Sequence, residues 1–141
     1  MLRDRLNTRD MLQRRHWHVD DHSCVLCPYL IHEDIAHLFF SCNFSVRVWD
    51  YLQIHWDPQP GMTTYNKAVK ARKDFGHIFF TEVVFTTAWN TWILRNGKVF
   101  RNERPSFRAW RHNFIHDITL LSHRIKCKYK DSLLTWISNL P

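Results

Sequence analysis

The chain has 141 residues and a formal net charge of +7 at neutral pH, and 45% of its residues are apolar. That apolar content excludes an intrinsically disordered chain, and the length fits one domain or a small metal-binding unit joined to a helical one. With only 3 glycines, the sequence disfavours an all-β architecture with many tight turns. No apolar run approaches the ~18 residues that a membrane span needs.

The charge is distributed unevenly along the chain. Residues 1–57 contain six Lys or Arg against eight Asp or Glu, a net of −2, whereas residues 58–141 contain fourteen against five, a net of +9. The two stretches meet at the proline- and glycine-containing segment 57–64, where we expect a boundary. A basic balance usually indicates a polyanion or an acidic protein surface as partner, and here this indication belongs to the second half.

The first predicted elements lie on either side of a cysteine-rich segment. Residues 7–15 predict a short helix with Asn7 or Thr8 as N-cap, since both side chains accept hydrogen bonds from free backbone N–H groups. The cysteine-rich segment runs from about residue 20 to residue 42. A second helix, capped by Asn43, is predicted directly after it.

The basic half predicts three further helices. Residues 64–75 indicate a basic helix, and residues 78–96 are apolar on most sides, which predicts a buried helix that ends near Asn96 and Gly97. Pro105 marks the start of one last amphipathic helix, which reaches to about residue 134. Its apolar residues recur at steps of three and four and are Phe107, Trp110, Phe114, Ile118, Leu121 and Ile125. The predicted fold is mainly α: a small cysteine-rich unit with flanking helices (1–57) and a helical, bundle-like half (58–141) packed on it, as two units or one continuous domain.

Three of the four cysteines fall between residues 24 and 42, together with two histidines. The pair Cys24-x2-Cys27 has the spacing that presents two thiolates to one metal ion. Two sets of four ligands are consistent with the spacing, and both contain this pair and His37. The fourth ligand is His32 in a compact knuckle, or Cys42 in a Cys3His site. Because four such ligands suit Zn²⁺ and leave no position open for water, we expect a structural zinc ion.

Catalysis is not expected at this site. A hydrolytic zinc site needs an open coordination position and a carboxylate base. Glu33 and Asp34 lie between the candidate ligands, but we interpret them as solvated charges of a loop. A redox role of the thioredoxin type needs a βαβ context, which the sequence does not indicate. We therefore expect a protein that is not an enzyme.

The N-terminal segment bears on the compartment. It is rich in arginine, as mitochondrial presequences are, but Asp4 and Asp10 interrupt it, and presequences avoid acidic residues. It contains no apolar stretch of the kind found in secretory signals, so the cysteines do not indicate a disulfide framework. We expect an intracellular protein of the cytoplasm or nucleus.

The cysteine-rich region resembles the zinc-binding, reverse-transcriptase-associated domain of plant LINE-type (non-LTR) retrotransposon polyproteins. The family pattern is a Thr-(Lys/Arg)-Asp-x-Leu-x-x-Arg segment, a C-x2-C pair, an Asp-His-Leu-Phe-x-x-C segment and a later aromatic residue. The matching residues are Thr8, Arg9, Asp10, Leu12, Arg15, Cys24, Cys27, His37, Leu38, Phe39, Cys42 and Trp49, with Ala36 where an Asp often stands. A weaker similarity to a downstream Trp-x-x-x-Arg-Asn-x-x-x-Phe segment involves Trp92, Arg95, Asn96 and Phe100.

This resemblance implies which residues bind the metal ion, and it implies no enzymatic activity. It favours Cys24, Cys27, His37 and Cys42 as the metal ligands and leaves His32 as a loop residue. It carries over no polymerase or endonuclease activity: the chain is too short for a palm domain, and the pair Asp20-Asp21 lacks an aromatic residue two positions before it. The family segment follows Met1 closely, so we expect a short, stand-alone fragment of a retroelement that has been co-opted as a protein of its own.

Two binding functions follow from the charges and the aromatic residues. A row of basic residues recurs every three or four positions between residues 95 and 111, with aromatic residues between them, as in proteins that bind single-stranded nucleic acid. The candidate binding residues are Arg95, Lys98, Arg101, Arg104, Arg108, Arg111 and Trp110. The alternative interpretation is that the aromatic residues belong to the core and the basic residues to its solvated reverse face.

The second function is protein binding. Acidic residues border the metal unit, whereas nucleic-acid knuckles are usually bordered by positive charge. Aromatic residues make up 15% of the chain, more than one small core accommodates, and surplus aromatic side chains are typical of interfaces. We therefore expect a non-enzymatic, zinc-stabilised adaptor that acts through a protein partner, with RNA or DNA binding by the basic half as the alternative.

Overall fold

The computed structural model describes residues 6–18 and 21–141 and is mainly helical, as predicted. Within these residues, the β-type pairing is a single antiparallel bridge between Ser23 and His32. The helices, in chain order, are α1 (Arg9–Arg14), the π-helical turn η1 (His37–Ser41), α2 (Asn43–Tyr51), α3 (Thr64–Phe75), α4 (Phe80–Arg101), α5 (Phe107–Ser122) and α6 (Cys127–Ser138).

Local capping explains where the short helices begin and end. The Thr8 hydroxyl accepts a hydrogen bond from the Met11 N–H and caps α1, and the Thr63 hydroxyl accepts one from the Asn66 N–H and caps α3. Gly76, with φ of 72°, ends α3 in the left-handed conformation that glycine adopts without strain. The expected cap of α2 was wrong by one residue: Cys42 occupies the N-cap position and Asn43 is the first helical residue.

Helix α4 differs from its prediction in length and in burial. It continues past Gly97 to Arg101 and ends at Asn102, whose φ of 53° provides the left-handed cap. A Cβ at Gly97 would meet the carboxylate of Glu103, which is the end of an exposed and flexible side chain. The helix is also not buried on all sides. One face carries the α4 apolar stripe, whose side chains are 62%, 58%, 37% and 68% exposed at Phe85, Trp89, Ile93 and Phe100.

The last predicted helix is two helices. α5 begins after the cap Ser106, ends at Ser122, and is followed by a turn at residues 123–126 that reverses the chain into α6. The predicted inward face of α5 is confirmed: Trp110, Phe114 and Ile118 are fully buried, and Phe107 and Leu121 pack against the same core. The turn places α6 against this core through the buried Leu133. A straight continuation would have carried these residues away from the core, because a helix extends about 1.5 Å per residue.

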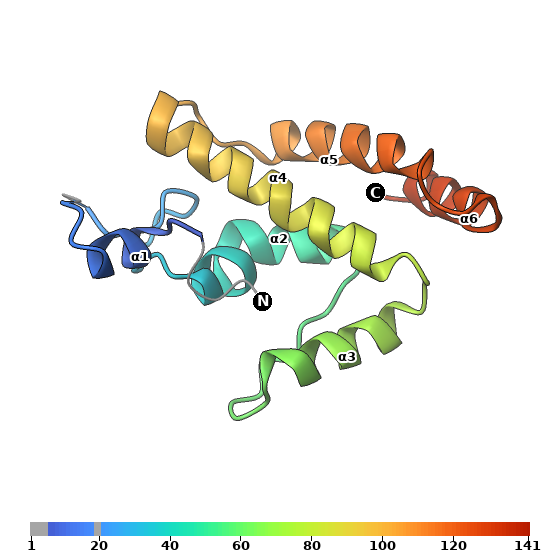
Figure 1. Cartoon of the computed structure of the whole chain (residues 1–141), viewed down its shortest axis with the longest axis horizontal. Coiled ribbons are helices and arrows are strands. Elements are labelled where there is room, and N and C mark those ends of the chain that lie inside the picture. The colour runs from blue at the N-terminus through green and yellow to red at the C-terminus, as the bar shows by residue number, and fades with distance from the viewer. Residues whose placement is uncertain (1–5, 19–20) are drawn as a thin grey trace.

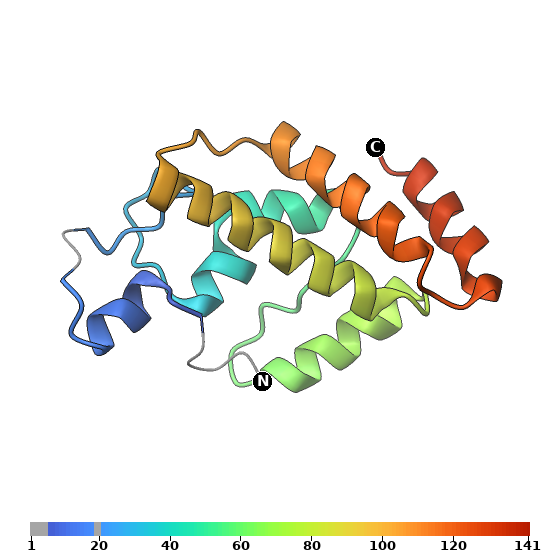
Figure 2. The same cartoon turned by 45° about the horizontal axis from the view of Figure 1, so that its top comes forward.

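Helix α4 crosses the middle of the molecule, and α5 lies beside it in both views (Figures 1 and 2). The main core gathers buried side chains from both the acidic and the basic half of the sequence. They are Val48, Trp49, Leu52, Ile54, Ala71, Phe79, Phe80, Val83, Trp110, Phe114, Ile118 and Leu133. A smaller cluster around Cys24 and Cys42 packs against Ala88 and Trp92 of α4. The proposed division at residue 57 stays a prediction.

Among the described residues, none of the helices combines the length and the apolar character that crossing a membrane requires.

Candidate metal centre

The first two candidate ligands lie in a loop that is folded back on itself. The bridge between Ser23 and His32 closes the loop, and the Cys24 N–H donates to the Ile31 carbonyl over 2.7 Å. Within it, the Leu26 N–H points at the Cys24 sulfur, 3.4 Å away. Leu30 turns the chain with a positive φ of 52°. These contacts hold the sulfurs of Cys24 and Cys27 on the same side of the loop.

The other two candidate ligands flank a π-helical turn. His37 begins η1, and the Cys42 N–H donates to the His37 carbonyl over 2.7 Å, a bond that spans five residues. A π-turn of this kind leaves carbonyl groups without partners in the helix. Side chains of α2 satisfy two of them: the Ser45 hydroxyl donates to Leu38 O over 2.5 Å, and the Trp49 Nε1–H donates to Phe39 O over 2.7 Å.

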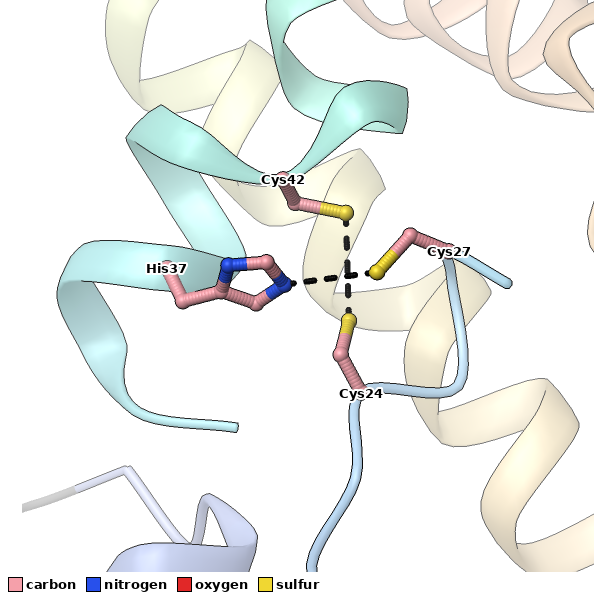
Figure 3. Close-up of side chains that lie close together, drawn as sticks. All are labelled: Cys24, Cys27, His37 and Cys42. Carbon is pink, nitrogen blue, oxygen red and sulfur yellow. Dashed lines mark hydrogen bonds between the residues drawn. The ribbon is translucent and has the colours of Figure 1, made fainter. Parts of the chain in front are cut away.

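The loop and the turn bring four ligand atoms together. Figure 3 shows the side chains of Cys24, Cys27, His37 and Cys42 converging on one point, and their ligand atoms all lie within 4.8 Å of one another. The Cys24 and Cys42 sulfurs are 3.8 Å apart, and the Cys27 sulfur lies 3.5 Å from His37 Nε2. Two thiolates bound tetrahedrally at ~2.3 Å from zinc are separated by roughly 3.8 Å, so this donor set fits the ion. The cysteines are free thiols, and the spacing is far longer than a disulfide bond.

Protonation in the cluster is governed by burial and by the contact between sulfurs. The pKa of the Cys24 thiol is raised, first because Cys24 is hydrogen-bonded to Cys42 and then because it is buried. The same hydrogen bond lowers the pKa of Cys42. Burial lowers the pKa of His37 and favours its neutral form. Neutral imidazole and thiolate are the forms that bind a metal ion.

His32 lies outside this cluster, although its spacing made it an alternative ligand. Its Nε2 is 3.3 Å from the carboxylate of Asp10 in α1, and its side chain is half-exposed. The Nδ1 atom of the His37 ring lies 3.4 Å from the Ser41 hydroxyl, and the backbone N–H of His37 donates to the Asp34 carboxylate. The structure thus brings together the Cys3His set and not the compact knuckle.

The four candidate ligands lie in a segment that matches a known family model. Residues 1–49 match the family model described as zinc-binding in reverse transcriptase. The match ends within α2, so the helices from α3 to α6 lie outside it. No curated protein and no solved structure matches the chain.

The non-ligand residues of the zinc-binding reverse-transcriptase motif connect α1 to the metal loop. The Arg9 guanidinium donates to the carbonyls of Asp21 and Ser23 over 2.7 and 2.9 Å, and Thr8, fully buried, caps the helix that carries it. Trp49 closes the open end of the π-turn through its bond to Phe39. These motif residues therefore position the ligands.

One interaction of the segment that carries the ligands was not predicted from the sequence. Glu33, interpreted as a solvated loop charge, has no exposed surface and forms an ion pair with the equally buried Arg95 of α4. Arg95 Nε lies 3.1 and 3.2 Å from the two carboxylate oxygens, Arg95 Nη2 lies 2.5 Å from Oε1, and the Arg9 N–H donates to the same oxygen. Arg95 is the one charged residue between Glu82 and Lys98, and such isolation in an apolar helix was the available signal.

The candidate binding row does not lie on one surface. Arg95 is paired with Glu33, and Trp110 is fully buried between Phe107 and Phe114, so neither residue is available to a partner and both assignments were wrong. Arg101, Arg104, Arg108 and Arg111 are exposed, and Lys98 is half-buried. Arg101 pairs with Glu103, and Arg111 donates to the Tyr51 hydroxyl and to the Pro141 carbonyl.

Proposed function

We propose that the chain is a non-enzymatic, zinc-stabilised adaptor that acts through a protein partner. The proposal joins two features of the molecule: a closed donor set that holds the N-terminal unit together and an uncovered apolar face on the central helix. It includes a retroelement origin of the plant LINE type, an inference from the motifs of residues 8–49.

Zinc has a structural role in this proposal. Cys24, Cys27, His37 and Cys42 are the four groups that would hold it, and no other group of three or more ligating residues gathers in the described part of the chain. Bound there, the ion supplies folding free energy and cross-links the metal loop to η1. Glu33 is engaged by Arg95 and is therefore not a free general base beside the donor set.

The α4 apolar stripe is the single observation that carries the protein-binding function. Three aromatic side chains on one helix are more than half exposed, whereas other side chains of that helix pack against the metal unit or the core. Exposed apolar patches mark candidate interaction sites, and interface centres are enriched in aromatic residues.

One observation favours the second candidate, RNA or DNA binding. A shallow groove of about 480 Å³ along α5 is lined by cationic and histidine side chains together with apolar ones. They are Arg108, Arg111, His112, Ile115, His116, Thr119 and Leu120. Two arginines fit contacts with phosphate, but Arg111 is already bonded to Tyr51 and to the chain end.

Affinity capture and mobility shifts at two salt concentrations test the proposal. With zinc-loaded full chain as bait, we expect a protein that stays bound at high salt and is lost with the double variant Phe85→Ser/Trp89→Ser. RNA and DNA should bind no more tightly than about micromolar at physiological salt, as non-specific binders do. A nucleic-acid complex of higher affinity that dissociates steeply with salt, together with no stripe-dependent protein, would refute the adaptor.

A further inference from the structure

The α4 apolar stripe consists of Phe85, Trp89, Ile93 and Phe100, at intervals of four, four and seven residues. These intervals place the four side chains on one face of a helix. The other faces of α4 have intramolecular partners: Ala88 and Trp92 pack against the metal cluster, and Asn90 donates to Asp117 of α5. The stripe is thus the one side of the central helix to which the described residues contribute no packing layer.

The size of the stripe limits what can cover it. A large aromatic side chain offers about 150–250 Å² for burial, so three that are roughly 60% exposed present a few hundred Å². A stable protein–protein interface typically buries about 800 Å² on each partner, so the stripe by itself supports a smaller contact. One helix laid along the stripe, with apolar anchors at steps of three and four, is the element that fits this area.

The charge of the molecule indicates the charge of the helix that would bind there. Between residues 83 and 97 the only charge is Arg95, and it is neutralised internally by Glu33, so the stripe itself offers no cation to a phosphate. The surrounding half of the chain carries a net +9 and attracts acidic groups at longer range. A second copy of a chain with net charge +7 would instead be repelled.

We propose that the α4 apolar stripe binds an acidic amphipathic helix of another protein. This inference rests on the proposed function and names the class of its partner. Phe85, Trp89 and Phe100 are the anchors in contact with the apolar face of the incoming helix. Its Glu and Asp side chains face solvent, where the net positive charge of residues 58–141 favours them at longer range.

The test uses the zinc-loaded full chain and two synthetic peptides of 20 residues. One has Leu at helical intervals with Glu on the opposite face, and the other has the same composition in an order that destroys amphipathicity. Binding is measured by calorimetry. We expect the amphipathic peptide alone to bind, and the double variant Phe85→Ser/Trp89→Ser to weaken this binding at least tenfold. Tyr65→Ser, which removes an exposed aromatic residue of α3, is the matched control and should change nothing.

Other outcomes overturn the inference in distinguishable ways. Equal binding of both peptides, or binding that the double variant does not weaken, refutes an acidic helix on the stripe. If sedimentation shows that the parent protein self-associates and the double variant does not, the stripe binds a second copy of the chain. If the parent binds oligonucleotides and the double variant does not, the stripe binds nucleic acid. If affinity capture yields a stripe-dependent protein while neither peptide binds, the partner class is wrong and the adaptor function stands.

Discussion

Glu33 and Arg95 form an ion pair without exposed surface, although 62 residues separate them in the chain. The pair joins the metal loop to the central helix α4, and the Trp92 ring lies against the guanidinium, 5.0 Å from its carbon. The metal loop and the segment around Arg95 are separate motifs in the sequence, and they are in contact in the structure. This contact joins the metal loop to the helical half of the chain.

Breaking this pair should be far more damaging than replacing it. Arg95→Met leaves the buried carboxylate of Glu33 without its cation, which typically costs about 3–5 kcal/mol of the free energy of unfolding. The double variant Glu33→Leu/Arg95→Met removes both charges and should recover a large part of that loss. Urea unfolding of the zinc-loaded proteins measures the free energy of unfolding of Arg95→Met, Glu33→Leu and the double variant. If the loss in the double variant equals the sum of the two single losses, the pair is not coupled.

The histidines should separate clearly in a metal-binding assay. We predict that His37→Ala loses the metal and that His32→Ala retains it, because only His37 converges with the three sulfurs while His32 contacts Asp10. Metal analysis after gel filtration provides the comparison. The opposite result, with zinc retained by His37→Ala and lost from His32→Ala, would establish the compact knuckle as the ligand set.

Two tryptophans provide a matched test of core and surface. Trp110 is fully buried and stacks on Phe114 with ring centroids 5.1 Å apart, so Trp110→Ala should destabilise the protein by about 3–5 kcal/mol. Trp89 is exposed on α4, and Trp89→Ala should stay within ~0.5 kcal/mol of the parent. Thermal or urea unfolding measures both variants. Comparable losses of stability in both variants would mean that Trp89 is packed against other residues of the chain in solution. The stripe would then not be free to bind a partner.

Charge reversal discriminates between the two kinds of partner. Arg101, Arg104 and Arg108 are exposed, and changing all three to Glu reverses the charge of that surface. With a protein partner held by apolar contacts, we predict slower association and a complex that persists. Surface plasmon resonance with the captured partner follows the two rates. A nucleic-acid complex that is abolished by the triple change, along with its salt dependence, would assign the function to the basic surface.

Several elements were predictable because their determinants are local. Thr63 and Gly76 delimit α3 through capping and a left-handed turn, and the three-and-four spacing of Trp110, Phe114 and Ile118 correctly orients α5. The ligand candidates were equally visible, since the C-x2-C pair is a short-range pattern. The family resemblance then favoured Cys42 over His32, in agreement with the geometry of the cluster.

The features that were missed depend on contacts between distant segments. The spacing that suggested one helix from Pro105 onward continues through Ile125, but the chain turns at residues 123–126 because α6 can then bury Leu133 in the core. No glycine or proline marks that turn. In the same way, helical spacing placed Arg95 in a basic row, and only the position of Glu33 in three dimensions shows that its charge is buried.

The zinc content of the purified protein tests the central claim most directly. The prediction is one equivalent of Zn²⁺ per chain, removed by a strong chelator with loss of the tertiary structure around residues 21–45, since structural sites contribute on the order of 10 kcal/mol to folding. Near-ultraviolet circular dichroism follows that loss through Trp49 and Trp92, which contact the metal unit. Less than about half an equivalent of zinc in protein with all thiols reduced, or a disulfide between Cys24 and Cys27, would contradict a zinc-stabilised fold.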